Sequence, residues 1–415
     1  MKRMVVIAAA IVGLRSSVVS ADSLTVDDCV RLALTRSPAV RASSFTTDVA
    51  RARYGAARAA YLPVLSAEAE YGRSTGYDVA VTNGGSTKAV VKAEATLLDG
   101  GTRRAQVAAA GARVQASGET ERDERAAVAF AVREAYFGAL AAAEEVAVRE
   151  QALDTLTSDV RLLERQERSG LVPANAVLRA RITVESTRTS RRAAAGDLAA
   201  RRGALGLLSG IDPGAVSLVD PGEPPPLAPA ADAVENVPAV AAARLTLEAA
   251  RRERESVERE RWGKLTLSAD TGALGVEPAT TFHDDRGAEV LAGLRIPLFD
   301  AVLSANVAGA RAEVAAAEAS LERAREAARL EMIQIEQDAA RAKADLDAAR
   351  NSLPLSQENL ELMRARHAGG GDVRLLELLD ALTEQVNARL EVSHAMLAYR
   401  LAAARSAKLL GKPTP

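Results

Sequence analysis

Two carboxylates are the residues of this chain whose types and spacing point most directly to chemistry. Glu377 and Asp380 lie three positions apart at the start of a predicted helix, so both side chains share one helical face. Carboxylates held close together raise each other's pKa and attract cations. The alternative is an acidic helix start that only complements the helix dipole. The pair therefore becomes a site only if symmetry brings several copies of it together.

The histidines and the short motifs do not support an enzyme. His283, His367 and His394 are spread over the chain without the spacing of metal ligands. His283 stands beside two aspartates in a predicted hairpin loop, where a solvated cluster is the simpler interpretation. The sequence contains no glycine motif for phosphates and no nucleophile elbow. We therefore expect no enzymatic activity, no cofactor and no metal centre.

The acidic pair is positioned by a predicted helical hairpin that spans Ser304 to Gly411. A glycine-rich turn separates its long first helix from a second helix that opens near Leu375. Apolar residues of the long helix step by three and four, with one four-residue stutter, as in a coiled-coil seam. The helix is about 95 Å long at 1.5 Å per residue, so it needs partner helices along its whole length. The seam comprises Val307, Ala310, Val314, Ala317, Leu321, Ala324, Ala328, Met332, Ile335, Ala339, Ala342, Leu346, Ala349 and Leu353.

Composition favours an elongated helical protein over a set of globular domains. The chain has 415 residues, but only 3% of them are aromatic, and alanine, leucine, arginine and glutamate dominate. Its 53 basic residues nearly balance its 55 acidic residues, so charge gives no indication of a nucleic-acid partner.

The first 21 residues have the pattern of a secretory signal peptide. Two basic residues precede an apolar run from Met4 to Leu14, and small residues precede Asp22. A short membrane anchor is the alternative. The single cysteine, Cys29, lies too far beyond the predicted cleavage point to carry a lipid anchor, and it has no partner for an intrachain disulfide. No later segment contains 18 unbroken apolar residues.

Four short segments alternate between apolar and polar residues and are predicted to be strands. They cover about 64–73, 88–98, 264–274 and 288–298, and each consecutive pair forms a hairpin. Helices are predicted at about 24–60, 103–168 and 174–208, before the long hairpin described above.

The chain also repeats itself. Equivalent residues recur at an offset of 200 or 201: Pro38 and Pro238, Tyr61 and Trp262, Asp99 and Asp300, Ala180 and Ala381, Gly210 and Gly411. This predicts a signal peptide (1–21), a first repeat (22–210), a proline-rich extended linker (211–237), a second repeat (238–411) and a short tail (412–415).

Strands of about ten residues with one apolar face suit a membrane β-barrel. Four strands are too few to close a barrel, and an open edge in lipid leaves backbone groups unsatisfied. Subunits should therefore share one barrel. Tyr61, Trp262 and Phe299 flank the predicted hairpins and would lie at the membrane interface. The alternative is that the hairpins are soluble caps on a helical rod.

Several short motifs, taken together in their order and duplication, resemble the outer membrane efflux protein family, the TolC-like channels. The resemblance covers Leu24 to Gly411. It is carried by Leu32-Ala33-Leu34, Ser37-Pro38, Tyr61-Leu62-Pro63, Leu98-Asp99-Gly100-Gly101, Ile296-Pro297-Leu298-Phe299-Asp300, Gly371-Asp372-Val373 and the segment from Leu376 to Ala381.

The resemblance implies a mainly α fold with a membrane β-barrel. Three copies of the chain would form a 12-stranded barrel in the outer membrane, continued by a 12-helix α-barrel in the periplasm. The homotrimer would be the exit duct of a tripartite efflux pump or a type I secretion system. Its expected partners are a periplasmic adaptor (membrane fusion protein) and an inner-membrane transporter, which would deliver drugs, metal ions or proteins.

The resemblance also implies roles for particular residues. Glu377 and Asp380 match family positions that form acidic rings at the narrowest point of the pore, so they are the predicted gate. The predicted adaptor-docking tips are Ser169, Gly170, Leu171 and Val172 in one repeat, and Gly369, Gly370, Gly371, Asp372 and Val373 in the other. The glycines could instead serve only to reverse the chain.

Three segments depart from the family pattern. Asp300-Ala301-Val302 lacks the usual glycine pair, Gly263-Lys264 replaces an expected proline, and His367-Ala368 replaces an aromatic residue. A soluble periplasmic coiled-coil scaffold or adaptor remains the alternative function. Release by osmotic shock would indicate the scaffold, whereas a detergent requirement would indicate the duct.

Overall fold

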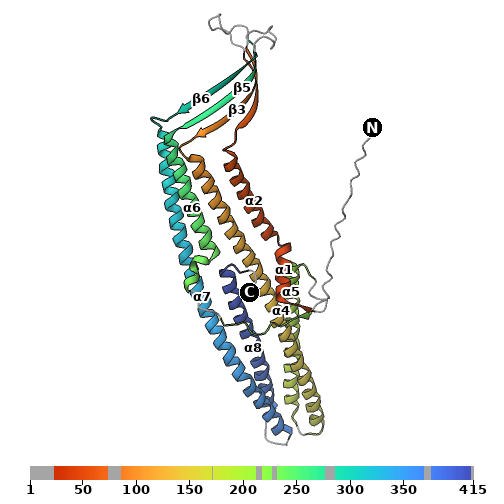
Figure 1. The fold of residues 1–415 in the computed structure, drawn as a ribbon. Helices are drawn as coiled ribbons and strands as arrows, with labels where there is room; N and C mark the ends of the chain where they lie inside the picture. Colours follow the sequence, from red (N-terminus) through yellow and green to blue (C-terminus); the bar gives the residue numbers. More distant parts are fainter. Residues whose placement is uncertain are drawn as a thin grey trace, which may run out of the picture. The chain divides into compact units, whose positions relative to one another are not determined.

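A computed structural model describes residues 23–72, 86–170, 172–211, 217–226, 231–275, 286–368 and 375–412 (Figure 1). The predicted signal segment therefore lies outside the described residues. The chain forms two compact units. Unit 1 comprises Met1–Arg36, Ala131–Pro226 and Ala340–Ala403, and unit 2 comprises Ser37–Phe130, Leu227–Ala339 and Ala404–Pro415. The long helices α4 (Thr102–Arg168) and α7 (Ala301–Ala368) contribute residues to both units.

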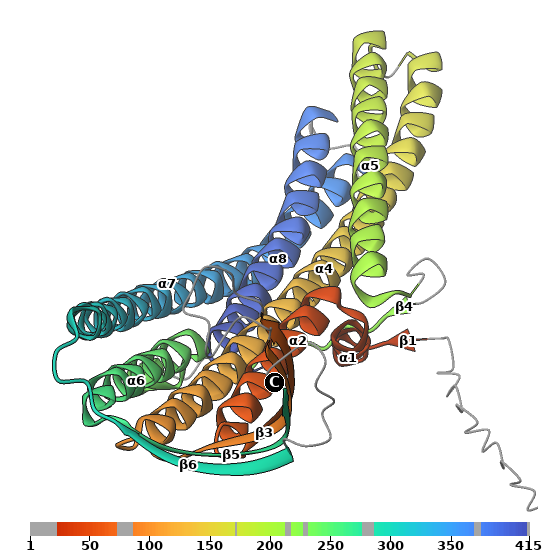
Figure 2. The same cartoon turned by 90° about the horizontal axis from the view of Figure 1, so that it is seen from above.

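Unit 2 contains one antiparallel sheet of four strands in the order β2-β3-β5-β6. The strands are β2 (Val64–Gly72), β3 (Ser86–Leu98), β5 (Lys264–Gly275) and β6 (Arg286–Arg295). Seen from above, the sheet is curved (Figure 2). β6 ends three residues earlier than its alternation predicts, because Pro297 has no N–H with which to continue the ladder.

The two faces of this sheet differ in chemistry, as the alternation predicted. One face is mostly apolar and exposed; its large members include Leu65, Tyr71, Val91, Leu98, Val290 and Leu294. The other face carries the charged residues Glu68, Glu70, Lys88, Lys92, Glu94, Asp270 and Glu289. Within the described residues, β2 and β6 pair along one side only, so both outer edges of the sheet are open.

The helices of unit 2 pack through small and branched apolar residues. α2 (Pro38–Ala59) and α6 (Pro238–Arg259) both begin with proline at the first helical turn, where its missing N–H costs nothing. α6 packs against α7 in a cluster that includes Val240, Leu247, Val314, Leu321, Met332 and Ile335.

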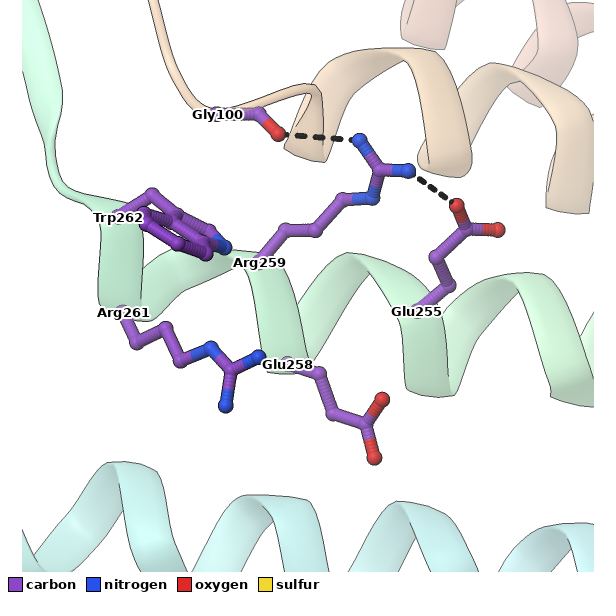
Figure 3. Close-up of a pocket in the computed structure, with 6 residues that line it drawn as sticks. All are labelled: Gly100, Glu255, Glu258, Arg259, Arg261 and Trp262. Atoms are coloured by element: carbon purple, nitrogen blue, oxygen red, sulfur yellow. Dashed lines mark hydrogen bonds and ion pairs between the residues drawn. The ribbon is translucent and has the colours of Figure 1, made fainter.

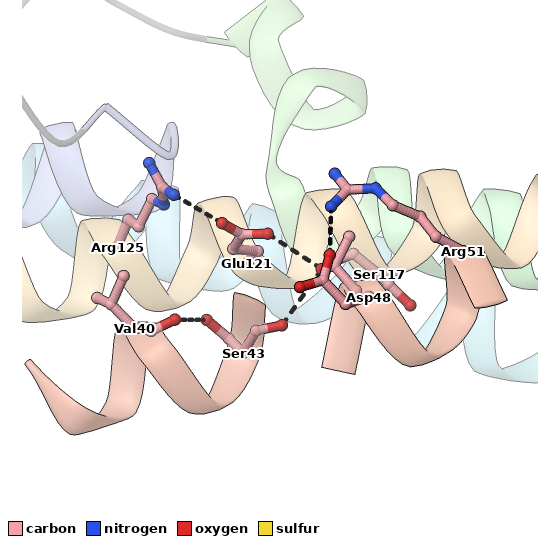
Figure 4. A network of polar contacts seen from close by, with 8 residues as sticks. Val40, Ser43, Asp48, Arg51, Ser117, Glu121 and Arg125 are labelled. Carbon is pink, nitrogen blue, oxygen red and sulfur yellow. Dashed lines mark hydrogen bonds and ion pairs between the residues drawn. The ribbon is translucent and has the colours of Figure 1, made fainter. Parts of the chain in front are cut away.

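One polar network joins α2 to α4 in unit 2 (Figure 4). The buried hydroxyl of Thr47 lies 3.0 Å from Oε2 of Glu121, and Glu121 pairs with Arg125 at 2.7 Å. The same hydroxyl lies 3.2 Å from the Ser43 carbonyl oxygen. A buried hydroxyl needs such partners, so this network fixes the position of α2 along α4.

Unit 1 brings the N-terminal segment together with the linker between the repeats. β1 (Ser23–Leu24) pairs in parallel with β4 (Ser217–Leu218), and α1 (Val26–Arg36) contacts α5 (Ala174–Ser209). The buried Tyr136 hydroxyl lies 2.7 Å from the Leu24 carbonyl oxygen and accepts a 2.9 Å hydrogen bond from the Val219 N–H.

The linker is therefore not the plain extended spacer that its prolines predicted. It contains β4 and a 3₁₀ helix, η1 (Ala231–Asn236). Its central segment is also bound to α8 (Leu375–Leu409), because the buried Arg400 pairs with Asp220 and donates to the Gly222 carbonyl oxygen at 3.1 Å. Backbone groups in an irregular segment need such partners when they lie against a core.

The predicted seam of α7 is confirmed as the buried stripe of that helix. Its buried members are Ala310, Val314, Leu321, Ala328, Met332, Ile335, Ala339, Ala342, Leu346 and Ala349. Among the described residues, one helix, α4, contains an 18-residue stretch that is apolar enough to cross a membrane, with a mean hydropathy of 1.4. Half of that stretch is buried inside the chain, as in a helix that packs in a core.

Candidate functional site

The first turns of α8 are anchored by an apolar cluster in unit 1. Residues from α4, α5, α7 and α8 meet there, and most are fully or nearly fully buried. The members are Leu156, Val160, Leu163, Val177, Ala180, Val184, Leu360, Leu378, Leu379, Ala381 and Leu382. The repeat equivalents Ala180 and Ala381 both lie in it, where small side chains allow the helices to approach closely.

The predicted gate residues lie on the opposite side of α8 from this cluster. Glu377 and Asp380 are both exposed, whereas Leu378, Leu379 and Ala381 between and beside them are buried. Within the described residues, neither carboxylate forms an ion pair. The helix therefore presents two unneutralised negative charges on one face.

This acidic pair belongs to one repeat only. At the offset of 201, the counterparts of Glu377 and Asp380 are Ala176 and Arg179 on α5. Arg179 is exposed as well. The two repeats are thus similar in backbone and core at this end, but differ in the charge that they expose.

The predicted docking tips are only partly covered by the structure. Ser169 and Gly170 form the turn after α4, with Gly170 at φ +71° and donating to the Glu167 carbonyl oxygen at 2.9 Å. Val172, also predicted as a docking residue, is partly buried and packs against the apolar cluster at the start of α8. Leu171 and the second tip, Gly369 to Val373, lie outside the described residues.

A second group of functional candidates lies where the sheet of unit 2 meets its helices. Asp99 follows β3 and accepts hydrogen bonds from the N–H groups of Gly101 and Arg103, both at 3.0 Å. Its Oδ2 also pairs with Nε of Arg103 at 2.6 Å. Partial burial would raise the pKa of Asp99, but the hydrogen bonds from Arg103 and Gly101 outweigh it and hold the pKa below its usual range.

Arg103 and its neighbours also position the predicted interface aromatics. The Arg103 guanidinium lies 4.5 Å from the ring centroid of Tyr61 and donates to the Ala60 carbonyl oxygen at 3.1 Å. Such a cation over an aromatic face stabilises both groups. The Tyr61 side chain is therefore held at the junction although half of it is exposed.

Trp262 has a comparable setting in the second repeat (Figure 3). It lies beside Gly100, which has φ +64°, and the guanidinium of Arg261 lies 5.6 Å from its ring centroid. Arg259 spans the same depression of about 610 Å³, donating to the Gly100 carbonyl oxygen and pairing with Glu255. Phe299 is 92% exposed. All three predicted aromatics thus lie at the junction with accessible rings.

The structure explains why the junction between β6 and α7, in the second repeat, needs no glycine pair. Asp300 caps α7 directly: its Oδ1 accepts from the Leu303 N–H at 2.9 Å, and α7 begins at the next residue, Ala301. In the first repeat, α4 begins only at Thr102, after both glycines have turned the chain with positive φ. The counterpart of Arg103 is Ser304, so the second junction lacks the arginine network.

The sequence did not predict that two cationic residues at this junction lie side by side. Lys264, noted above only as a departure from the family pattern, lies directly opposite Arg295 in the sheet register. Only the pairing of β5 with β6 reveals this. In the described ranges, no three His, Cys, Asp or Glu side chains are grouped as a metal ion would require.

Comparison with known proteins gives a consistent answer. The family described as outer membrane efflux protein matches residues 29–210 and 230–412. Protein CyaE of Bordetella pertussis is 32% identical over 359 residues, which covers 80% of this chain and 71% of that protein.

Solved structures share the fold at lower identity. A membrane protein from Pseudomonas aeruginosa matches 93% of this chain and 90% of its own with a TM-score of 0.82 and 24% identity. The outer membrane protein VceC of Vibrio cholerae matches 93% of this chain and 96% of its own with a TM-score of 0.80 and 18% identity. The chain therefore belongs to the outer membrane efflux protein family, as its motifs predicted.

Proposed function

We propose that this protein is the outer-membrane exit duct of a tripartite efflux pump or a type I secretion system. Three copies would form a 12-stranded barrel in the outer membrane and a 12-helix α-barrel in the periplasm. The duct would conduct substrates passively, while an inner-membrane transporter and a periplasmic adaptor select and deliver them. Membership of the outer membrane efflux protein family supports this function and does not favour a soluble scaffold.

The single observation that carries the proposal is the sheet with two open edges and an exposed apolar face. β2 and β6 are paired along one side only within the chain, and the apolar face includes exposed Leu65 and Leu294. In lipid, each unsatisfied edge N–H or C=O group costs several kcal/mol. Pairing of β2 with β6 of the next copy removes both edges and leaves the apolar face toward lipid.

Exposed apolar side chains on the helices support the same assembly. In unit 1, Leu178 and Ile182 are exposed one turn apart on α5, and Leu355 and Leu362 are exposed two turns apart on α7. These spacings place each pair on one face of its helix. Neighbouring copies in a ring would cover such faces, because a closed symmetric ring joins two different surfaces of each subunit.

The exposed acidic pair gives this duct a gate. Three copies of Glu377 and Asp380 would form two acidic rings at the periplasmic end of the tunnel. Such rings attract cations and set a barrier for anions. The turns at Ser169–Val172 and Gly369–Val373 would dock the adaptor.

Disulfide trapping of the open edges tests the proposal directly. In a Cys29→Ala background, one cysteine replaces Ala67 on β2 and another replaces Ala288 or Ala292 on β6. Oxidation in isolated outer membranes should yield a covalent trimer on denaturing gels. The matched control replaces Ala93 and Ala269, which are register partners within the chain and should cross-link without raising its apparent mass. A monomeric band for every edge pair, together with osmotic-shock release of the protein, would contradict the proposal.

A further inference from the structure

Two cations face each other at the end of the sheet where it joins the helices. Lys264 on β5 is the register partner of Arg295 on β6, so both side chains lie on the same face, and both are exposed. Like charges directly opposite each other destabilise an antiparallel pair. A nearby carboxylate, or an anion from outside the chain, would relieve this repulsion.

Backbone geometry keeps this pair together. Gly263 has φ +73°, and a Cβ atom at this position would lie 2.3 Å from the Arg295 carbonyl oxygen. Only glycine allows the two strand ends to approach this closely. This close approach holds the backbone of Lys264 beside that of Arg295.

No carboxylate of the described residues neutralises the pair. Neither Lys264 nor Arg295 forms an ion pair there. The acid that follows β3 is Asp99, and its oxygens are already bonded to Arg103 and Gly101. Glu260 precedes the pair on η2 (Glu260–Trp262), is exposed and makes no ion pair with either cation.

Other cations on the same face have acidic partners. Lys88 pairs with Glu68 at 3.5 Å and Lys92 with Glu94 at 3.2 Å. Apart from Lys264 and Arg295, the charged residues on this face are five carboxylates and two lysines. They are Glu68, Glu70, Glu94, Asp270, Glu289, Lys88 and Lys92. The Lys264 and Arg295 pair is thus a local reversal of charge on an otherwise acidic face.

We infer that Lys264 and Arg295 form an anion-binding collar inside the duct, for phosphate, sulfate or carboxylate groups of passing substrates. This inference rests on the proposed function, because the polar face lines the lumen only if the apolar face meets lipid. Three copies would place six cations in one ring at the entrance to the barrel. A guanidinium beside an ammonium binds an oxyanion through several charge-assisted hydrogen bonds. Anionic cargo would then be favoured at the step from the helical tunnel to the barrel.

Single channels in planar bilayers test the collar with inorganic phosphate as the probe. Phosphate added on the periplasmic side should reduce the current through the unmodified channel. In Lys264→Gln/Arg295→Gln, the phosphate concentration for half block should rise about tenfold, the effect of losing charge-assisted hydrogen bonds. The share of chloride in the current, obtained from reversal potentials in a KCl gradient, should fall as well. Lys88→Gln on the same face is the matched control for the block and should leave the phosphate concentration for half block unchanged.

Each outcome decides the inference. Equal phosphate block in the double variant and in the unmodified channel would overturn it. A dependence of the current on anionic phospholipid in the bilayer, without any effect of aqueous phosphate, would place the cations against lipid headgroups and would also overturn it. Failure of the unmodified protein to form channels would instead contradict the proposed function. Should the double variant not assemble, Lys264→Gln alone serves, because it relieves the repulsion and should preserve folding.

Discussion

Arg103 and Asp99 form an ion pair of 2.6 Å at the point where strand β3 gives way to helix α4. Both side chains are largely buried, with 11% and 16% of their surface exposed. Arg103 further reaches the Ala60 carbonyl oxygen and the ring of Tyr61. One side chain therefore joins the end of α2, the end of the sheet and the start of α4.

Replacing Arg103 by alanine should weaken this junction more than a surface change would. It removes charge-assisted hydrogen bonds and leaves Asp99 partly buried, at a cost of about 2 kcal/mol. The measurement is the temperature at which the detergent-purified protein loses its native oligomer on gels. Arg104→Ala is the control, because Arg104 is exposed and forms no ion pair within the described residues. Equal losses in both variants would contradict the role of Arg103.

Asp99 should make the stability of the protein depend on pH in the acidic range. Its pKa in the folded chain is held below the ordinary value of 3.8. A carboxyl with a lowered folded pKa stabilises the fold above its unfolded pKa and loses this contribution as the pH falls through the folded value. Stability should therefore decline below about pH 4. Asp99→Asn should be less stable at neutral pH and show a flatter decline, which denaturation at stepped pH values would measure.

Tyr136 should control the attachment of the linker. Tyr136→Phe removes the hydrogen bonds to the Leu24 and Val219 backbone while preserving the ring, at a cost of about 1–3 kcal/mol for the buried groups left unpaired. We expect faster hydrogen exchange and proteolysis in residues 217–226, with the sheet unaffected. Burial raises the pKa of Tyr136 to about 12. The raised pKa means that the neutral hydroxyl stabilises the fold fully below about pH 10, and that this stabilisation is lost as the pH rises toward 12. Stability at alkaline pH should therefore fall less steeply in Tyr136→Phe than in the unmodified protein.

The acidic pair should set the electrical properties of the closed duct. Glu377→Gln/Asp380→Asn should raise single-channel conductance for anions and relieve block by divalent cations, because the two rings lose their charge. Glu391→Gln, an exposed acid farther along the same helix, is the control. Conductance and block that match the unmodified channel in planar bilayers would reject the gate assignment.

Substitutions of two leucines of α7 should distinguish packing within the chain from packing between subunits. Leu346 is fully buried within the chain, so Leu346→Ala should cost about 2–5 kcal/mol and lower the yield of folded protein. Leu355 is exposed in the single chain. Leu355→Ala should leave the folded chain intact and weaken trimer assembly by about 1–2 kcal/mol per subunit. Cross-linking yield against total folded protein distinguishes the two effects, and an unchanged trimer yield in Leu355→Ala would contradict the proposed helix contact.

Local patterns allowed much of the fold to be predicted from the sequence. The stripe of α7 from Ala310 to Ala349 is buried because a helix returns the same face every three or four residues. The polar and apolar faces of the four strands follow from a period of two in the same way. The offset between equivalent residues such as Pro38 and Pro238 revealed the duplication, and the structure places both prolines at a helix start, where the missing N–H costs nothing.

The sequence by itself thus determined the long helices and the four strands of the sheet, which faces they bury and to which family the chain belongs, but not the short elements β4 and η1 of the linker. Only the tertiary structure decided which distant residues meet: Lys264 with Arg295, Tyr136 with Val219, Arg400 with Asp220, and Val172 with the cluster at α8. The physical reason is that the periodicity of apolar residues indicates which face of a helix or strand is buried, but not which other element packs against that face. Strand register, and the backbone carbonyls that a side chain reaches across the fold, arise only when the whole chain has packed.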